Sequence, residues 1–537
     1  MSTPVDQWRP GMDITADRLQ FMLERLTTSI SVDAYGAAGD GVTDDTAAVQ
    51  AALNTARDQG GGVVYLSPGK TYAVTTFLVV YDFTTIQAYG ATVRSVGTTG
   101  LLRNFLSTEA FDGYSGHSHI TIMGGTWDAN AFDGTTGTVS GTTNAFGFVH
   151  CSNITVRDLT ITNVSSAHAV EFNSTSGARV LNCRFMGYRD NSGNGSRAFS
   201  EAVQIDMAVS GSAAIGNHDE TMSRDILIQG CYVGPSSRLG SFGRGFGSHM
   251  LRVGKYYYGI QIIGNRIEGV AQQGIYGFGW RRVVIANNVI NGSGLSGIQL
   301  SRPDPAGAAP SEGFTVNGRN ISITGNTIEG AKDASGIRVY GAAGGTYDQV
   351  VISGNSVLGF STDSSNGIHV EYCSRPNVTG NTISGTASSG IVVFNSDGAQ
   401  VGSNVIRSSG SNGVNVTGCS GANVTGNTVD GTSSNHGIFV ATSNDVVVTS
   451  NRIDGAAAAG IRLSDGCQDG MVTGNRIIKG AGTNGITVSA TTADGNTIAM
   501  NDLTGNGWSV GTALIISTTA STSFSGGTAV PGDNLVS

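Results

Sequence analysis

A short pattern recurs through the second half of this chain. Each copy has Gly-Ile or Gly-Val followed by alternating polar and apolar residues, and a second apolar segment then ends in Gly-Asn-x-Ile or a close variant, as in Gly380-Asn-Thr-Ile383. The copies begin at Ser296, Ser335, Asn366, Ser389, Asn412, His436, Ala459 and Asn484. Where no loop intervenes, the spacing is about 23 residues, which is the period of a solenoid.

The alternation within each copy indicates strands rather than helices. Ile and Val alternate with polar residues, so each strand buries one face and exposes the other. Stacked copies would align apolar side chains inside and polar ones outside. The repeated Asn would form a ladder whose amides bond the backbone and each other at a turn. The sequence therefore predicts an all-β fold, a right-handed, single-stranded parallel β-helix.

The chain divides into three parts. Its 537 residues are compatible with one continuous solenoid, which we place at residues 30–505. Residues 1–29 form a short N-terminal helical leader, whose apolar stripe must pack on sister chains or on a docking protein to be stable. Residues 506–537 lose the period, and we expect them to cover the C-terminal end of the solenoid or to pair across sister chains.

A capping helix is predicted at the start of the solenoid. Asp44 to Thr46 can begin a helix in which Val49, Leu53 and neighbouring alanines form an apolar face. Such a helix would cover the open N-terminal end of the β-helix and prevent end-to-end pairing.

Composition excludes several classes of partner. The net charge of −9 argues against nucleic acid or an anionic membrane as the main partner. No stretch is long and apolar enough to span a bilayer, and the N-terminus lacks the pattern of a signal peptide. The six Cys have neither disulfide nor zinc spacing, so we predict no metal and no cofactor, with Cys183 and Cys231 stacked as thiols.

The early copies can be aligned with the late ones. Residues 169–173 (Ala-Val-Glu-Phe-Asn) align with residues 202–206 (Ala-Val-Gln-Ile-Asp), and then with Gly274-Ile-Tyr276. Extra residues between these copies predict loops, near 187–200, 207–222, 234–244, 303–319 and 340–347. Loops leave a solenoid at its turns, so on one side they would wall a groove in the N-terminal half.

The outward columns of the looped copies concentrate chemically capable side chains: Glu171, Asn173, Gln204, Asp206, His249, Tyr276, Gln299, Arg338, Tyr340, His369 and Glu371. Adjacent strands and a two-residue offset would place Glu171 and Asp206 roughly 5–10 Å apart, which covers both retaining and inverting glycosidase geometry. One carboxylic acid would protonate the glycosidic oxygen, and the other would activate water or attack the anomeric carbon. His249 would hold a substrate hydroxyl or raise the pKa of the acid, although a turn histidine satisfied by backbone is an equal alternative.

Further residues suit glycan binding. Tyr276 and Trp280 can stack on sugar rings, with a core position as the alternative for Trp280. Glu201 is a second acid candidate. Arg244 and Arg338 can bind carboxylate or sulfate groups, or be ordinary surface charge.

Two motifs resemble known families. The run Gly36-Ala-x-Gly-Asp-Gly-x-x-Asp-Asp-Thr46, followed by Gly60-Gly-Gly-x-Val-Tyr-Leu-x-x-Gly69, resembles the opening of the pectate-lyase-like β-helix superfamily, which includes plant-polysaccharide enzymes, alginate epimerases and phage tailspikes. The segment Trp8-x-Pro-Gly-x-x-Ile-Thr-Ala-x-Arg-Leu19 is similar to leaders of phage tail proteins. The chain lacks the calcium-binding Asp cluster of the pectate lyases and the Tyr-Gly-x-Asp-Pro-His run of the epimerases.

This resemblance implies a phage tailspike-like protein on the virion tail, attached to a tail or baseplate protein by the leader. We expect it to bind and cleave a bacterial surface polysaccharide, by hydrolysis. One alternative is a lyase in which His249 or Tyr276 abstracts a proton. Another is a receptor-binding or structural tail protein that cuts nothing. The flat sides of a β-helix also predict a homotrimer.

Overall fold

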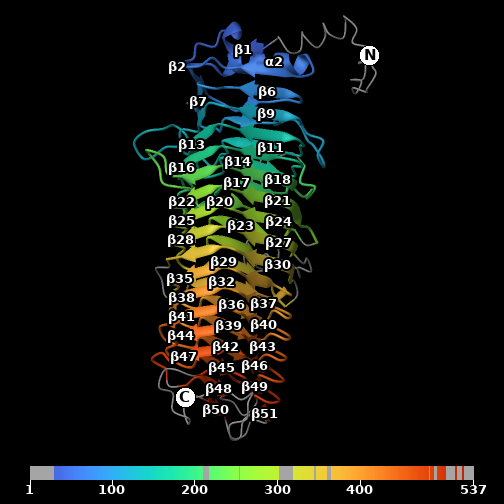
Figure 1. The fold of residues 1–537 in the computed structure, drawn as a ribbon. Helices are drawn as coiled ribbons and strands as arrows, with labels where there is room; N and C mark the ends of the chain where they lie inside the picture. The colour runs from blue at the N-terminus through green and yellow to red at the C-terminus, as the bar shows by residue number, and fades with distance from the viewer. Residues whose placement is uncertain are drawn as a thin grey trace, which may run out of the picture.

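The computed structural model describes residues 29–209, 217–252, 254–301, 318–343, 346–359, 365–482, 484–488, 493–503, 514–516 and 523–524. These residues form a parallel β-helix, as the repeat predicts. Three long sheets run along one column, and successive strands of the chain pass from sheet A to sheet B to sheet C (Figure 1). One turn of the solenoid, a rung, thus contributes one strand to each sheet.

The strands of sheet C carry the site described below. They are β5 (Leu78–Val79), β8 (Leu102–Arg103), β11 (Phe146–Val149), β14 (Val170–Asn173), β17 (Glu201–Asp206), β20 (Arg244–Gly247), β23 (Ile275–Phe278), β26 (Ile298–Ser301), β29 (Ser335–Tyr340), β32 (Asn366–Glu371), β36 (Ile391–Phe394), β39 (Val414–Thr417), β42 (Ile438–Ala441), β45 (Ile461–Leu463), β48 (Ile486–Val488) and β50 (Leu514–Ile516).

Sheets A and B complete the rungs. Sheet A contains β1 (Ser29–Ser31), β3 (Gly62–Tyr65), β6 (Thr84–Gln87), β9 (Ile120–Met123), β12 (Ile154–Arg157), β15 (Arg179–Leu181), β18 (Arg224–Gln229), β21 (Tyr257–Ile263), β24 (Trp280–Ala286), β27 (Gly318–Thr324), β30 (Tyr347–Ser353), β33 (Cys373–Ser374), β34 (Asn377–Thr379), β37 (Gln400–Gly402), β40 (Asn423–Thr425), β43 (Val447–Thr449), β46 (Met471–Thr473), β49 (Thr497–Ala499) and β51 (Ser523–Phe524). Sheet B contains β2 (Asp40–Asp44), β4 (Thr71–Val74), β7 (Thr92–Ser95), β10 (Thr126–Asp128), β13 (Thr160–Ser165), β16 (Arg184–Arg189), β19 (Tyr232–Gly234), β22 (Arg266–Glu268), β25 (Val289–Asn291), β28 (Thr327–Glu329), β31 (Ser356–Leu358), β35 (Thr382–Ser384), β38 (Val405–Ser409), β41 (Thr428–Thr432), β44 (Arg452–Asp454) and β47 (Arg476–Ile478).

The core follows from the period-2 alternation. In β17, Val203 and Ile205 point into the solenoid and are fully buried, and Ile275 and Ile298 continue the same column in β23 and β26. Each such side chain contributes about 1.5–3 kcal/mol of burial free energy, which sets the register of its strand. The intervening residues face outward, and on sheet C they form the floor of the site.

The Asn of each Gly-Asn pair forms the predicted ladder. The glycine before it adopts a positive φ, as at Gly380 (φ 66°), and this bend turns the Asn side chain inward. The side chain of Asn381 donates to Asn404 (3.0 Å) and to the carbonyl of Ile352 (2.9 Å). The buried ladder runs through Asn265, Asn288, Asn326, Asn355, Asn381, Asn404, Asn427, Asn451, Asn475 and Asn501.

Cysteines replace Asn above the ladder. The backbone N–H of Cys183 faces the Cys231 sulfur at 3.4 Å, and the N–H of Cys231 donates to Asn265 Oδ1 at 2.8 Å. All six cysteines are free and buried. The stacked thiols were predicted from the sequence.

The ends of the solenoid differ. A 3₁₀ helix, η1 (Val32–Tyr35), leads to the predicted capping helix, α2 (Thr46–Asp58), which covers the N-terminal end (Figure 1). Val49, Ala52, Leu53 and Ala56 of α2 are buried against the first rungs. The N–H of Thr46 is capped by the carboxylate of Asp44 at 3.0 Å, while Asp45 bonds the N–H groups of Ala38 and Gly39.

At the other end, two short strands extend beyond the predicted boundary at residue 505. β50 pairs with β48 and β51 pairs with β49. The first strand, β1, already begins at Ser29, while the leader helix lies outside the described residues. Among the described helices, none has the length and apolarity needed to cross a membrane.

Candidate functional site

The predicted alignment of β14 with β17 is confirmed. Glu171 lies beside Gln204, and Asn173 lies beside Asp206. On the next rung, Gly247 of β20 lies beside Gln204, and Gly247 lies beside Tyr276 of β23. Glu171 and Asp206 are therefore diagonal neighbours on adjacent strands, on the order of 8 Å apart between Cα atoms.

A cleft of about 440 Å³ lies over these strands. Its floor includes Glu171, Asn173, Gln204 and Asp206, and His249 lies at one side. Two loops wall it. One is the predicted loop between β16 and β17, which contributes Arg197 and Phe199; the other precedes β11 and contributes Thr142, Thr143 and Asn144.

Glu201 is the centre of a buried ion-pair network. Its carboxylate is 3.0 Å from Arg244 Nη1, 3.2 Å from His249 Nδ1 and 3.4 Å from His168 Nδ1. Burial alone would raise the pKa of Glu201, but the charges of His249 and Arg244 hold it below its usual range. Glu201 is the first residue of β17 and, unlike Asp206, does not line the cleft, so it positions its neighbours rather than facing a substrate.

The pKa of Asp206 is shifted upwards, whereas that of Glu201 is shifted downwards. Its Oδ1 accepts the backbone N–H groups of His249 and Met250, each at 3.2 Å, and its side chain is 1% exposed. Burial, together with the nearby negative charge of Glu201, raises the pKa of Asp206 to about 7 despite the opposing charge of His249. This carboxyl group can thus carry a proton near neutral pH.

His249 connects the two carboxylates. Its Nδ1 lies 3.2 Å from Glu201 Oε2 and 3.5 Å from Asp206 Oδ2, and its ring is stacked against His168 at 5.5 Å. Burial opposes protonation, but Asp206 and Glu201 together raise the pKa of His249. His168 is fully buried, and its pKa falls to about 3 because burial disfavours its charge. His249 is consequently the cationic member of the pair.

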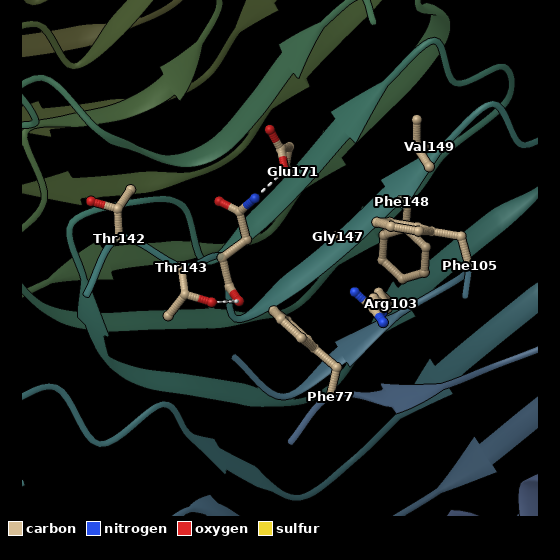
Figure 2. A pocket seen from close by; sticks show the side chains of 10 residues that line it. Phe77, Arg103, Phe105, Thr142, Thr143, Gly147, Phe148, Val149 and Glu171 are labelled. Carbon is tan, nitrogen blue, oxygen red and sulfur yellow. Dashed lines mark hydrogen bonds between the residues drawn. The ribbon is translucent and has the colours of Figure 1, made fainter. Parts of the chain in front are cut away.

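Glu171 lies at the opposite end of the cleft. Its carboxylate accepts a hydrogen bond from the side-chain amide of Asn144, drawn as the dashed line at Glu171 in Figure 2. Burial raises the pKa of Glu171. A smaller cavity of about 170 Å³ continues from Glu171 over Gly147 towards Arg103. Glu171 therefore borders both cavities.

His168, Glu201 and His249 have the spacing of a possible metal site, since one ligand atom from each lies within 4.8 Å of the others. Arg244 already binds the same carboxylate and supplies the positive charge. The backbone N–H of Glu201 also faces His168 Nδ1 at 3.1 Å. We therefore interpret these three residues as part of an ion-pair network and assign no metal to them.

Arg244 is held within the protein rather than free for a ligand. Its guanidinium lies 4.1 Å above the Tyr276 ring, and its Nε donates to Gln272 and Gln273. Burial raises the pKa of Tyr276 to about 12. Tyr276 is 9% exposed, which leaves one edge of its ring at the surface.

The remaining predicted residues continue the outward columns beyond the cleft. Gln299 lies beside Tyr276 and Arg338, and His369 follows Arg338 on the next rung. Arg338 stacks over Tyr340 at 4.2 Å, and Glu371 lies 3.5 Å from His369. Burial lowers the pKa of His369 to about 4. These residues form a second polar cluster that does not line the cleft.

The position of Trp280 corrects the proposal that it stacks on sugar. Its side chain is 0% exposed, and its indole N–H donates to Ser248 at 2.8 Å. Trp280 begins β24 in sheet A, so it belongs to the core. The alternative prediction, that Trp280 is a core residue, is therefore the correct one.

Sequence reasoning missed the residues contributed by loops. Asn144, Arg197 and Phe199 lie outside the repeat, so no alignment of rungs could place them. The sequence alignment placed His168 in the same column as Glu201 but gave it no role in the site.

Comparisons with known proteins agree with this architecture. The family described as "Right handed beta helix region" matches residues 225–366 and 366–529. The family described as "Rhamnogalacturonase A/epimerase, pectate lyase-like" matches residues 29–237.

Two relatives are named for different activities. The chain is 27% identical over 298 residues to plasmin and fibronectin-binding protein A of Streptococcus pneumoniae, covering 51% of this chain and 41% of the relative. It is 26% identical over 277 residues to a capsule-specific depolymerase of Klebsiella phage K64-1, covering 51% of this chain and 32% of the relative. The chain thus spans less than half the length of these relatives.

Solved structures share the fold. The Streptococcus pneumoniae surface protein and adhesin PfbA has a TM-score of 0.56 at 19% identity, covering 77% of this chain and 100% of that chain. The tailspike protein of E. coli bacteriophage HK620 in complex with pentasaccharide has a TM-score of 0.51 at 15% identity, covering 90% and 82%. Since a right-handed β-helix family matches more than half of the sequence and the three-sheet column is that fold, the chain belongs to the right-handed β-helix proteins.

Proposed function

We propose that this protein cleaves a bacterial surface polysaccharide in the cleft over β14 and β17, by hydrolysis between Glu171 and Asp206. The observation that carries the proposal is Asp206, a carboxyl group with a pKa of about 7 on the floor of a cleft, one strand away from a second carboxyl group. The phage depolymerase relative supports a glycan as the substrate.

The two carboxyl groups take different roles. Asp206, protonated near neutral pH, donates its proton to the glycosidic oxygen as the bond breaks. Glu171 activates a water molecule or attacks the anomeric carbon once it is ionised, and its raised pKa makes it the stronger base in that state. Their diagonal spacing allows either stereochemical outcome.

His249 and Glu201 support Asp206. His249 lies between the two carboxylates, and its other ring nitrogen faces the side-chain amide of Gln204 at 3.4 Å. Glu201 fixes the position of His249 and keeps a negative charge near Asp206, which favours the protonated state of Asp206. We assign both as positioning residues.

The lyase alternative needs a base that is unprotonated at the working pH. The pKa of His249 is raised by its two carboxylate neighbours, and the pKa of Tyr276 is about 12. Tyr276 therefore holds its proton near neutral pH, and a protonated His249 must lose its proton before it can act as a base, which favours hydrolysis over proton abstraction.

Glycan binding without cleavage is the second candidate. The pneumococcal relative is named for binding plasmin and fibronectin, so this type of β-helix also suits a binding protein. In either case we propose a place on the virion tail, with residues 1–29 as the attachment to a tail or baseplate protein and three chains side by side.

One experiment separates these reactions. Purified protein is incubated with capsule or cell-wall polysaccharide of a candidate host, and both new reducing ends and the absorbance of unsaturated uronates are followed. Hydrolysis raises only the first signal, lysis raises both, and a binding protein raises neither. Failure to release reducing ends from any glycan that the protein binds would refute the proposed cleavage.

A further inference from the structure

A gap in one outward column of sheet C creates the smaller cavity. Gly147 of β11 lies beside Arg103 of β8 on one side and beside Glu171 of β14 on the other. A Cβ atom at Gly147 would have only the Glu171 carboxylate near it, at 4.0 Å. The missing side chain thus leaves open space between a cation and a carboxyl group, and Figure 2 shows Gly147 between them.

Arg103 is an uncompensated cation in an apolar setting. Its guanidinium lies 5.0 Å from the ring centres of both Phe77 and Phe105. Its Nε is buried and has no hydrogen-bond partner within the described parts of the chain. Over the same residues, no carboxylate forms an ion pair with Arg103.

The carboxylate whose charge acts on Arg103 is that of Glu109, and it already binds other groups. Glu109 accepts the N–H of Leu106 at 2.6 Å and lies 3.3 Å from His117 Nε2. Burying a guanidinium between aromatic rings without a paired anion is costly, so such an arrangement suits an anion that arrives with a ligand.

The cavity has the size and lining for a small acidic group on a ring. Its volume of about 170 Å³ lies well below that of a drug-sized pocket, so it accommodates a single sugar substituent or ring. The guanidinium matches a carboxylate with two parallel hydrogen bonds, and the partly exposed Phe77 side chain supplies apolar surface for the ring.

We propose that this cavity is a subsite for an acidic sugar, in which the carboxylate of a uronic acid residue binds Arg103 and the sugar ring lies over Gly147 beside Glu171. The subsite rests on the proposed function in that it names the substrate as an acidic glycan. The net charge of the chain is −9, so recognition of such a glycan depends on local cations of this kind.

The test uses two glycosides that differ only at C6. Methyl β-D-glucuronoside and methyl β-D-glucoside are titrated against the full chain and followed by ligand-observed NMR. We expect the glucuronoside to bind at least about tenfold more tightly, the scale of one charge-assisted bidentate contact. Equal binding of the two glycosides would overturn the subsite.

Two variants locate the binding. Arg103→Gln removes the charge, and Gly147→Val fills the cavity without changing Arg103, so both are expected to abolish the preference for the glucuronoside. Arg407→Gln, an exposed arginine of sheet B, is the matched control and should keep the preference. A preference that survives in both Arg103→Gln and Gly147→Val, with unchanged thermal unfolding, would place the uronate elsewhere.

Sulfate distinguishes a sugar carboxylate from any anion. Equimolar sodium sulfate should leave glucuronoside binding in place, whereas complete displacement would overturn the assignment to a sugar. The result is also separable from cleavage: Arg103-dependent uronate binding in a protein that releases no reducing ends supports the subsite and refutes the hydrolase. Cleavage of acidic and carboxyl-reduced polymers at equal rates, without a preference for the glucuronoside, would support the hydrolase and refute the subsite.

Discussion

The carboxylate of Asp206 lies 3.5 Å from the imidazole of His249, and both groups have raised pKa values. Because hydrolysis needs Asp206 protonated, kcat/KM should fall as pH rises through about 7, where Asp206 loses its proton. On the acid side it should fall as Glu171 becomes protonated. Initial rates of reducing-end release across a pH series check this, and a rate that keeps increasing well above neutral pH would exclude Asp206 as the acid.

Neutral replacements of the two carboxylates should nearly abolish turnover. Glu171→Gln and Asp206→Asn are each expected to reduce kcat by at least ~10²-fold, the scale of lost acid–base catalysis. The double variant should be little worse than either single one, because the two groups act in one step. Asp430→Asn, on the exposed face of β41, is the control and should keep full activity.

Asp206 is more buried than its outward position suggested, so its variant needs a folding control. The carboxylate accepts two backbone N–H groups, and Asn keeps an oxygen for them but presents an N–H₂ towards Gln204. Thermal unfolding of Asp206→Asn should therefore be compared with that of wild type. Full activity in both single variants would transfer the catalytic assignment to His369 and Glu371.

The Asn ladder should be a measurable source of stability. Asn404 donates to Val378 O at 2.8 Å and to Asn427 Oδ1 at 2.9 Å, and it accepts from Asn381. Asn404→Ala leaves these buried groups unsatisfied and should lower the free energy of unfolding by at least about 2 kcal/mol. Chemical denaturation checks this against Asn444→Ala, an exposed Asn in the turn between β42 and β43, which should have almost no effect.

The leader is predicted to be separable from the solenoid. β1 begins at Ser29 and Ile30 packs into the core, so a deletion should end at residue 28. The truncated protein should keep its fold and its glycan activity but should not be incorporated into particles. Virions that still carry the truncated chain would contradict the role of the leader as an anchor.

The proposed trimer is tested by mass. Static light scattering of the full chain at micromolar concentration should give three times the chain mass of 54.9 kDa. A monomeric mass under these conditions would contradict the trimer.

The repeat was sufficient to predict the fold, because the Ile and the ladder Asn of each copy specify the same strand and turn. It was also sufficient for the pairing of Glu171 with Gln204, because a parallel stack transfers register from one rung to the next. The capping helix was predictable from Asp44 and the apolar stripe that follows.

The parts of the site that were not predicted depend on contacts between distant segments. Asn144 reaches Glu171 from a loop, and Arg197 reaches His168 from another. Neither loop belongs to the repeat, so aligning the copies could not predict the position of either loop. The burial of Trp280 and Glu201 depends on what packs over them. A strand pattern predicts only on which face of the strand a side chain lies.

The Asn ladder ends at Asn265, and the rungs that contribute β17 and β20 to the cleft have Cys183 and Cys231 in its place. Sulfur is a weak hydrogen-bond acceptor, so these rungs are joined less strongly at that turn than those that follow. Backbone amides beneath the cleft should thus exchange with solvent faster than those after Asn265. The rungs beneath the cleft would then be the least rigid part of this stack, whereas the rungs after Asn265 keep their spacing.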